Sequence, residues 1–499
     1  MNASTFSAPS FLPPSSPSSA NLWTSREACQ ATGGKAEGNW VASGISIDSR
    51  SVQVGDLFIA IKGETLDGHS FVKDALSKGA VAAVVSQKVE GVPLENILIV
   101  ADTLKAMEDL GRAARSRTAA KIVGITGSVG KTGTKEMLGR AFGACGQTHY
   151  SERSLNNHWG VPLSLSRMHA GTDYGIFEMG MNHPNEITPL TAQVRPHLAI
   201  ITTVASTHIE HFSDGLDGIA RAKAEIFSSM DEHGIALLNC DIPQFGFLQS
   251  EAKRYGLKKI FSFGEAEGAH ACLVDCLVAS NGTRVKANIL GEEVTFTLKD
   301  AGKHIAVNAL SVLLAVKLLG ADLNKAISAI EAIEPPAGRG RREYLNIGDP
   351  ANPVTLIDES YNASPVAMQA AFKVMALIDP GRGGRRIAIL GDMYELGANA
   401  AAIHRDLILP LQASGVDLVY TCGPLMKNLH DALPEQKRGV HCDESPELAQ
   451  IVPDVLVPGD VVMVKGSRGG GDKPRMQVIV EALRALPAKR GEVANTKQG

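Results

Sequence analysis

The chain has 499 residues, 44% of them hydrophobic, which is enough for about three domains with substantial cores. Its 49 basic and 53 acidic side chains leave a formal net charge of −4, so the composition gives no support to general nucleic-acid binding. No apolar run approaches the ~18 residues of a membrane-spanning helix, and no membrane span is expected. The 7 cysteines are scattered without a C-x-x-C pair, which disfavours zinc and is typical of reduced thiols in a cytoplasmic protein.

Residues 1–20 are rich in Ser and Pro and lack the basic and apolar regions of a signal peptide, so we expect a disordered tail. In the first expected domain, residues 21–112, short apolar runs alternate with turn signals and a helical pattern, which indicates a small α/β unit. The sequence DSR, from Asp48 to Arg50, follows one expected strand, and a DGH sequence ending at His69 precedes the helix. From the residues alone, Asp48 and His69 are ordinary turn residues.

The second expected domain, residues 113–335, carries the sequence KIVGITGSVGKTGTKEM. Residues 121–126 predict a buried strand, residues 127–130 a loop of small residues, and Lys131 the start of a helix. A strand, a glycine loop and a helix N-terminus in this order bind anions, because the loop N–H groups converge and the helix dipole adds attraction. We therefore expect a nucleotide-phosphate site made by Thr126, Gly127, Ser128, Val129, Gly130, Lys131, Thr132 and Gly133.

Two side chains of this loop have expected tasks. Lys131 would reach the β- and γ-phosphates, and the Thr132 hydroxyl would hold Mg²⁺. The match to the general pattern G-x-x-x-x-G-K-S/T is incomplete, because Ile125 stands where a glycine is required. A chance G-K-T in a surface loop is the alternative, which the β-rich run before it and the helical pattern after it disfavour.

Other polar residues of the second domain follow strand-like runs or lie on helical patterns. Glu178 ends an apolar run, at the edge where open α/β sheets bind ligands, and a carboxylate there needs a partner. His208 follows the apolar run 196–204. From the residues alone, Lys223 is an ordinary helix lysine, and Asn308 belongs to a polar stripe on a core helix.

The third expected domain, residues 336–499, follows a linker rich in Pro, Gly and Arg. Strand-like and helix-like segments alternate along it, which predicts a mostly parallel, doubly wound sheet of the Rossmann-like type. The expected architecture is therefore α/β throughout, with a small first domain, a central parallel sheet that carries the phosphate loop, and a doubly wound third domain.

Together these sequences resemble the Mur ligase family, which extends the peptide stem of the peptidoglycan precursor. The loop T-G-x-x-G-K-T, with Thr126 and Gly127, is similar to this family's version of the phosphate loop. The family's N-N-x-x-G-x-P, G-R, L-G-D-M-x-E-L-G and K-G-S-R sequences match in the same order, so the resemblance covers residues from about 40 to 485. Thr203 is a departure, since the family usually has Asn there.

The resemblance implies contacts to the two nucleotides. Ser49 and Arg50 would lie against the UDP moiety of the substrate, since a hydroxyl and a guanidinium suit its oxygens. Asn308 would contact the adenine of ATP. Arg339 and Asp358 would meet the ATP from the third domain. Because Glu replaces the family's second Asp at the next position, the resemblance leaves open which of the two carboxylates does so.

The resemblance also implies a substrate loop containing Asn156 and Asn157, although an Asn-rich turn is the alternative. It implies two Mg²⁺ ions as well. The expected metal ligands are Thr132 and Glu178 at one ion, and His208 and Lys223 at the other. Lys223 would be carbamylated by CO₂, which turns an ammonium into an anion. The implied catalytic residues are Lys131, Lys223 and His208.

The activity implied by the resemblance is that of an ATP-dependent amide ligase. The motifs are most similar to those of the family's fourth amino-acid-adding ligase, which joins D-Ala-D-Ala to UDP-N-acetylmuramoyl-tripeptide through an acyl phosphate. We expect a monomer in the cytoplasm. The third amino-acid-adding ligase is the nearer alternative, but it would carry D-Y-A-H-x-P where this chain has DESYN. A folate-polyglutamate ligase would lack the UDP domain. A phosphate-loop NTPase acting as a switch would not need Glu178, His208 and Lys223 as a set.

Overall fold

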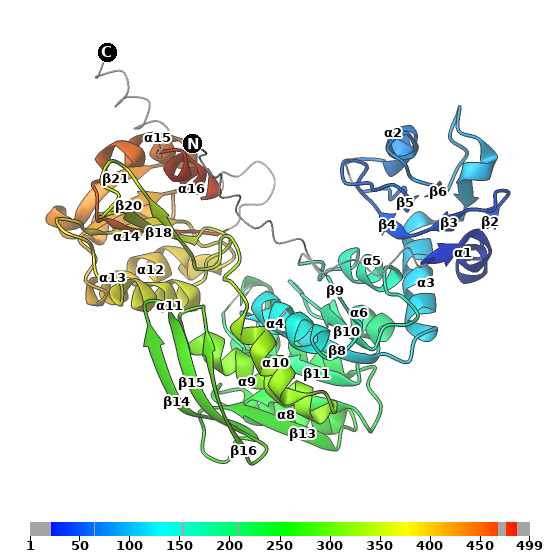
Figure 1. The fold of residues 1–499 in the computed structure, drawn as a ribbon, viewed down its shortest axis with the longest axis horizontal. Helices are drawn as coiled ribbons and strands as arrows, with labels where there is room; N and C mark the ends of the chain where they lie inside the picture. Colours follow the sequence, from blue (N-terminus) through cyan, green and yellow to red (C-terminus); the bar gives the residue numbers. More distant parts are fainter. Residues whose placement is uncertain (1–20, 64, 152–153, 207–208, 468–475, 487–499) are drawn as a thin grey trace, which may run out of the picture. The chain divides into compact units, whose positions relative to one another are not determined.

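The computed structural model describes residues 21–63, 65–151, 154–206, 209–467 and 476–486 (Figure 1). The tail expected at residues 1–20 lies outside these ranges. The chain divides into two compact units: residues up to 120 with residues 158–172, and residues 121–157 with those from 173 onward. In the described parts, no helix is long and apolar enough to cross a membrane. The domain boundaries near residues 112 and 335 stay predictions.

The first unit is built on a five-stranded sheet with the order β2-β7-β6-β5-β4. Its strands, parallel except for β2, are β2 (Lys35–Ala36), β4 (Gly44–Ser46), β5 (Asp56–Ile59), β6 (Ala82–Val85) and β7 (Ile97–Ile99). A separate pair joins β1 (Trp23–Thr24) to β3 (Val41–Ala42). The helices are α1 (Ser25–Thr32), α2 (Val72–Ser77), α3 (Thr103–Ser116) and α5 (Gly160–Ser166), with short turns η1 (Gly68–Phe71) and η2 (Leu94–Asn96).

Helix α5 belongs to this unit because it packs on α3. Every residue of α5 is buried, and a Cβ added to Gly111 of α3 would lie 3.2 Å from the Pro162 carbonyl oxygen. The Trp23 indole N–H donates to the Ser166 carbonyl at 2.8 Å, and the Arg117 guanidinium lies 3.9 Å from the centre of the same indole. The sequence predicted none of these contacts, because α5 lies in the middle of the second expected domain.

The second unit contains a nine-stranded sheet with the order β16-β15-β14-β13-β12-β11-β8-β10-β9. Its strands are β8 (Lys121–Thr126), β9 (Thr148–Tyr150), β10 (Tyr174–Glu178), β11 (Leu198–Ile201), β12 (Ile235–Asn239), β13 (Lys259–Gly264), β14 (Ala271–Ala279), β15 (Gly282–Ile289) and β16 (Glu292–Leu298). Neighbours from β9 to β14 are parallel, as expected. Strands β14, β15 and β16 pair antiparallel with one another and form an extension that was not predicted.

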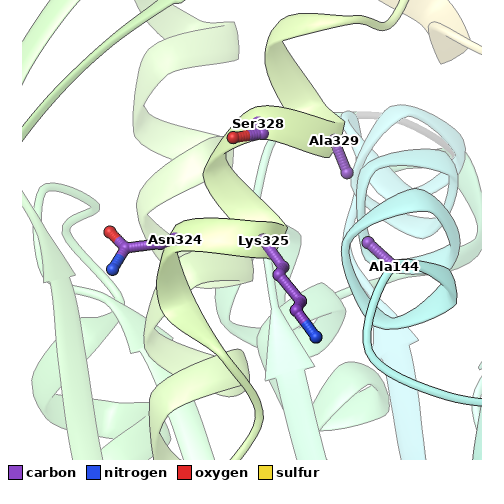
Figure 2. A pocket seen from close by; sticks show the side chains of 5 residues that line it. All are labelled: Ala144, Asn324, Lys325, Ser328 and Ala329. Atoms are coloured by element: carbon purple, nitrogen blue, oxygen red, sulfur yellow. The ribbon is translucent and has the colours of Figure 1, made fainter.

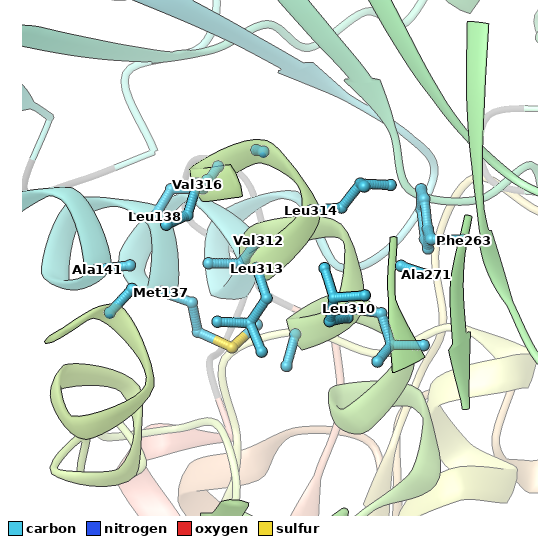
Figure 3. Packing of buried hydrophobic residues seen from close by; sticks show 14 of the residues in the cluster. Met137, Leu138, Ala141, Phe263, Ala271, Leu310, Val312, Leu313, Leu314 and Val316 are labelled. Carbon is cyan, nitrogen blue, oxygen red and sulfur yellow. The ribbon is translucent and has the colours of Figure 1, made fainter. Parts of the chain in front are cut away.

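The helices of this part include α4 (Lys131–Gly143), which follows the phosphate loop and packs against α9 (Lys303–Leu318). The others are α6 (Ile187–Val194), α7 (Gly215–Ala224), α8 (Phe245–Arg254) and α10 (Leu323–Glu331), with η3 (Ile209–His211) and η4 (Glu225–Phe227). Figure 3 shows Met137, Leu138 and Ala141 of α4 in one buried cluster with Leu310 and Leu313 of α9. Burying these side chains stabilises α4, and the loop precedes its first residue.

The remaining part of the second unit contains a six-stranded sheet with the order β17-β18-β22-β19-β20-β21. Its strands, parallel except for β17, are β17 (Arg341–Leu345), β18 (Val354–Glu359), β19 (Arg386–Gly391), β20 (Leu418–Cys422), β21 (Arg438–Cys442) and β22 (Val461–Lys465). The helices are α11 (Pro365–Ala376), α12 (Ala400–Arg405), α13 (Ile408–Ala413), α14 (Lys427–Ala432), α15 (Ser445–Val455) and α16 (Gln477–Arg484), with η5 (Gly397–Asn399) and η6 (Glu435–Lys437).

This sheet has a hydrophobic core on each face. One core takes residues from α11 to α14, and the other takes residues from α15 and α16 (Figure 1). Alternate residues of β18 divide between them, since Leu356 belongs to one core and Ile357 to the other. The doubly wound fold predicted for this part is confirmed, as is the α/β class of the chain.

Candidate active site

The phosphate loop joins the carboxyl end of β8 to α4, and β8 lies between β11 and β10. Gly127 and Gly130 have φ angles of +149° and +87°, which residues with side chains rarely adopt. A Cβ added to Gly130 would lie 2.8 Å from Asn308 Nδ2, so the Asn308 amide lies against the loop. The strand ends at Thr126 and the helix begins at Lys131, as the sequence predicted.

Hydrogen bonds tie the loop to the segment that follows β11. The Ser128 N–H donates to the Thr203 carbonyl at 2.9 Å, and the Ser128 hydroxyl bonds the backbone of Ala205 at 3.0 Å. The Thr202 hydroxyl donates to the Val129 carbonyl at 2.6 Å. Thr203 therefore supports the loop through its backbone, so its departure from the family's Asn does not remove this contact.

The Lys131 ammonium lies over the loop. It donates to the Gly127 carbonyl at 2.6 Å and to the Ser128 carbonyl at 3.4 Å. Burial lowers the pKa of Lys131, the nearby Glu178 carboxylate counteracts this, and the charge of Arg339 adds to the lowering. A polyanion beside the loop would stabilise the charged form of this lysine, as expected of a phosphate site.

Glu178 lies at the carboxyl end of β10 and is only 1% exposed. Its Oε1 accepts from Asn156 Nδ2 at 2.8 Å and from the Thr132 hydroxyl at 3.3 Å, and that hydroxyl lies 3.2 Å from the Ser154 hydroxyl. Its Oε2 has no hydrogen-bond partner among the described residues, and an unpaired buried carboxylate oxygen is costly. Carboxylate and hydroxyl oxygens are ligands that Mg²⁺ prefers, so these residues fit the predicted ion.

Lys223 is buried near the end of α7, with 3% of its surface exposed. Burial lowers the pKa of Lys223 well below its usual value, and the positive charge of Lys131 adds to this effect. Both effects favour the neutral amine over the charged ammonium. His208, its expected neighbour, lies outside the described residues. Within the described ranges, no three His, Cys, Asp or Glu side chains gather closely enough to hold a metal ion by themselves.

Glu225 connects the end of α7 to the start of α6. Its carboxylate accepts from the N–H groups of Asn185 at 2.6 Å, Ile187 at 3.1 Å and Thr188 at 3.1 Å, and from the Thr188 hydroxyl at 3.1 Å. These bonds hold the segment that carries Lys223 against the segment that follows β10. The sequence did not identify Glu225, because a glutamate on a helical pattern gives no signal of its distant partners.

We expect Glu225→Ala to lower the free energy of unfolding by about 2–4 kcal/mol, because three N–H donors, including that of the buried Ile187, lose their charged acceptor. Glu232→Ala is the matched control, since the exposed Glu232 pairs with Lys258 at the surface. The control should change stability by less than about 1 kcal/mol. Urea denaturation measures both, and equal stability of the two variants would count against this role of Glu225.

Residues of the third expected domain also reach this region. The Arg339 guanidinium lies 4.2 Å from the centre of the Tyr361 ring, and the Tyr361 hydroxyl lies 3.3 Å from the Ser154 hydroxyl. Asp358 is 2% exposed, and its carboxylate accepts hydrogen bonds from Gly338, Ser360 and Arg484. Ser154 and Tyr361 were not predicted as site residues, although Tyr361 lies within DESYN and Ser154 lies just before the expected substrate loop.

The predicted UDP contacts lie in the first unit, after β4. Ser49 is buried, whereas the Arg50 side chain is 86% exposed. Arg50 donates to both oxygens of Asp48, from Nε at 2.9 Å and from Nη2 at 2.7 Å, and its exposed face is open to an anion. His69 has a structural role, because one ring nitrogen bonds Asp67 at 2.6 Å and the other accepts from the Ser86 N–H at 2.9 Å. Asn157 is exposed.

A pocket of about 500 Å³ lies between α4 and α10 (Figure 2). It is lined by Ala144, Asn324, Lys325, Ser328 and Ala329. Ala144 follows the last residue of α4, whereas the phosphate loop precedes the first, so a helix length of about 20 Å separates the pocket from the loop. The pocket is therefore not part of the phosphate site.

Three family models match the chain. The Mur ligase family catalytic domain matches residues 41–120, the Mur ligase middle domain residues 125–316, and the Mur ligase glutamate ligase domain residues 340–468. A UDP-N-acetylmuramoyl-tripeptide–D-alanyl-D-alanine ligase of Escherichia coli is 33% identical over 88% of this chain and 93% of its own length. The ligase of the same name from Rickettsia prowazekii is 31% identical over 90% and 97%. The chain belongs to the Mur ligase family.

Solved structures of Mur ligases share the fold. MurF from Acinetobacter baumannii has a TM-score of 0.78 and 28% identity, covering 93% of this chain and 98% of its own. MurF ligase from Thermotoga maritima in complex with ADP has a TM-score of 0.72 and 26% identity, covering 90% and 98%. The family resemblance inferred from the phosphate loop and its accompanying motifs is thus confirmed.

Proposed function

We propose that this Mur ligase uses ATP to join D-alanyl-D-alanine to UDP-N-acetylmuramoyl-tripeptide, giving the pentapeptide precursor of peptidoglycan. The observation that carries the proposal is a group of ionisable side chains beside the phosphate loop, in which Lys131 interacts electrostatically with the buried Glu178 and the buried Lys223. The relatives that carry this activity in their names match nearly their whole length. That coverage favours the complete ligase over an NTPase switch.

The proposed reaction has two steps. A carboxylate at the end of the tripeptide attacks the γ-phosphorus of ATP, the bond to the β-phosphate oxygen breaks, and an acyl phosphate forms. The amine of D-alanyl-D-alanine then attacks the acyl carbon, phosphate leaves with the C–O electrons, and an amide remains after the nitrogen loses a proton. Lys131 and the loop N–H groups stabilise the charge on the transferred phosphoryl group. Asn308 faces the adenine, and Arg339 approaches from the third domain.

Thr132 and Glu178 would hold one Mg²⁺, and His208 with carbamylated Lys223 would hold the other. When bound, the ions neutralise charge on the phosphates. The unpaired Oε2 of Glu178 supports the first assignment. Ser49, Arg50, Asn156 and Asn157 are proposed to bind the UDP precursor. We place the enzyme in the cytoplasm as a monomer, where ATP is available.

Carbamylation of Lys223 is supported by its lowered pKa, because only the neutral amine attacks CO₂, forming an N–C bond and releasing a proton. Since burial lowers the pKa of Lys223, it favours the form that reacts with CO₂, and acid should reverse the reaction. With ¹³C-labelled bicarbonate, we expect a carbamate NMR signal that disappears in Lys223→Ala and persists in Lys325→Ala. A wild-type protein without the signal would contradict carbamylation.

The second candidate is the third amino-acid-adding ligase. The sequence DESYN from Asp358 to Asn362, where that enzyme would carry D-Y-A-H-x-P, disfavours it. Phosphate release should be measured with ATP, Mg²⁺, UDP-N-acetylmuramoyl-tripeptide and D-alanyl-D-alanine, omitting one component at a time. We expect release to require all four. Release that needs a single amino acid in place of the dipeptide would favour the second candidate, and release from ATP alone would favour an NTPase.

A further inference from the structure

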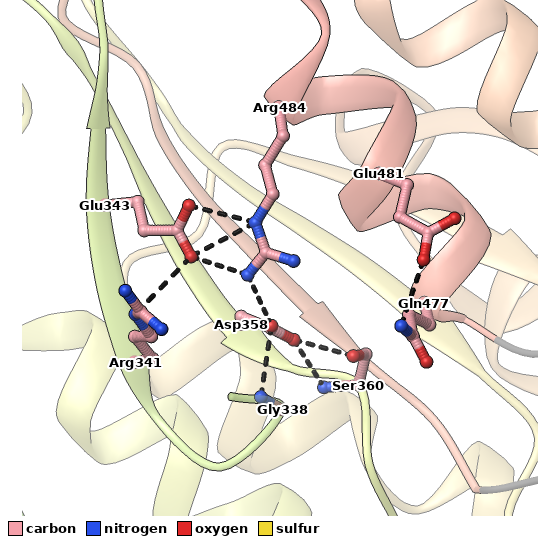
Figure 4. Close-up of polar contacts among 8 residues, drawn as sticks. All are labelled: Gly338, Arg341, Glu343, Asp358, Ser360, Gln477, Glu481 and Arg484. Carbon is pink, nitrogen blue, oxygen red and sulfur yellow. Dashed lines mark hydrogen bonds and ion pairs between the residues drawn. The ribbon is translucent and has the colours of Figure 1, made fainter. Parts of the chain in front are cut away.

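The Asp358 carboxylate has no hydrogen-bonding capacity left over. Its Oδ1 accepts from the Ser360 N–H at 3.2 Å and from the Ser360 hydroxyl at 2.6 Å (Figure 4). Its Oδ2 accepts from the Gly338 N–H at 3.0 Å and from Arg484 Nη2 at 2.9 Å. A carboxylate offers about four acceptor positions, and all are used here. Asp358 therefore meets a nucleotide hydroxyl only if one of these bonds breaks.

Arg484, the last residue of α16, supplies one of those bonds and joins two strands. Its guanidinium donates to Glu343 of β17, from Nε at 2.9 Å and from Nη2 at 2.5 Å, and Nη2 also donates to Asp358 of β18 (Figure 4). The hydrogen bonds to Glu343 are the main cause that raises the pKa of Arg484, so the guanidinium stays charged. One cation thus lies between two carboxylates.

The Asp358 carboxylate also holds the linker that carries Arg339, through its bond to the Gly338 N–H. Besides the bond to Asp358, the Gly338 carbonyl accepts from the Tyr361 N–H at 3.1 Å, and the Gly340 N–H donates to the Asp358 carbonyl at 2.8 Å. Gly338 and Gly340 have φ angles of +77° and +92°, so both depend on the conformational freedom of glycine. Arg339 lies between these two glycines, and its guanidinium covers the Tyr361 ring.

We propose that Arg484 is a positioning residue that, through Asp358, fixes the linker of residues 338–340 and so presents Arg339 to the nucleotide. The inference rests on the proposed function, in which Arg339 meets ATP. Without Arg484, the Glu343 and Asp358 carboxylates would face each other with no cation between them. Arg341 forms a longer ion pair with Glu343, in which its Nε lies 3.8 Å from Oε1, so Glu343 would keep only this weaker contact.

The test compares Arg484→Ala and Arg484→Lys with Gln477→Ala. Gln477 lies on the same helix and donates to the exposed Glu481 at 2.9 Å (Figure 4). Gln477→Ala therefore removes a side-chain bond of α16 and leaves the contacts of residues 338–340 in place. Binding of a non-hydrolysable ATP analogue is measured in each full-length protein, together with binding of UDP-N-acetylmuramoyl-tripeptide and the Tm. We expect Arg484→Ala to raise the Kd for the analogue about tenfold, and Arg484→Lys to raise it less.

The tripeptide Kd should change by less than about twofold, and added guanidinium ion should partly restore analogue binding in Arg484→Ala. An unchanged analogue Kd in Arg484→Ala would overturn the inference. So would an equal weakening of both ligands, or the same loss in Gln477→Ala. If Arg484→Ala does not fold, Arg484→Lys decides by the same criteria. Binding is measured without turnover, so the two proposals fail separately. If Arg484→Ala binds the analogue more weakly but the wild-type protein forms no amide, only the proposed ligase function is contradicted.

Discussion

Replacing Lys131 with alanine is expected to reduce dipeptide-dependent phosphate release by about 10³-fold or more, because its charge is proposed to stabilise the transferred phosphoryl group. The amine now lies 2.6 Å from the Gly127 carbonyl, at the loop where phosphates are proposed to bind. Because burial lowers the pKa of Lys131, an anion bound nearby would stabilise its charged form. We therefore expect the substitution to slow the transfer of phosphate from ATP. Initial rates of phosphate release at saturating substrates measure the effect.

Lys325→Ala is the matched control for Lys131→Ala. Lys325 lines the pocket between α4 and α10, at the other end of α4 from the loop (Figure 2). We expect the Lys325→Ala protein to release phosphate at a rate within about twofold of the wild type, since removing a surface side chain away from the site has little effect. If Lys131→Ala keeps the wild-type Tm and most of the wild-type rate of phosphate release, then Lys131 has no essential role in the reaction.

Glu178→Gln is expected to lower the rate by about 10²–10³-fold while preserving the fold, because the amide keeps the shape of the side chain and loses its charge. Oε1 is shared with Asn156 and Thr132, whereas Oε2 has no partner among the described residues. An ion bound there would use the free oxygen. The variant should therefore need a higher Mg²⁺ concentration for half-maximal activity, which a magnesium titration of the rate measures.

Glu293→Gln provides the control for this substitution. Glu293 is exposed on β16 and lies 3.4 Å from Lys286. We expect it to keep the wild-type magnesium dependence. If Glu178→Gln shows the wild-type rate and magnesium midpoint, then the Glu178 carboxylate does not hold the ion.

The parts predicted correctly from the sequence are those in which local signals decide the structure. The strand over residues 121–126 and the helix start at Lys131 follow from a β-rich run, two glycines and a helical pattern that agree with one another. The glycines at positions 127 and 130 take positive φ angles that few other residues tolerate. The position of Glu178 at the carboxyl end of its strand was also predicted, whereas its role as a metal ligand stays a prediction.

The parts that were not predicted depend on contacts between residues far apart in the chain. Helix α5 joins the first unit through Trp23 and α3, and no local pattern in its sequence indicates that partner. Glu225 and Arg484 look like ordinary surface charges on helical patterns until their acceptors and donors are seen. Asp358 was assigned to the nucleotide by resemblance, whereas its hydrogen bonds within the structure support a role in holding the linker.

The proposed ligase activity is tested most directly by the mass of the nucleotide product. The purified protein is incubated with ATP, Mg²⁺, UDP-N-acetylmuramoyl-tripeptide and D-alanyl-D-alanine, and the UDP-linked species are analysed by mass spectrometry. We expect a gain equal to one D-alanyl-D-alanine minus one water, matched by an equal amount of phosphate. A precursor of unchanged mass, or a gain of one amino acid alone, would contradict the proposed function.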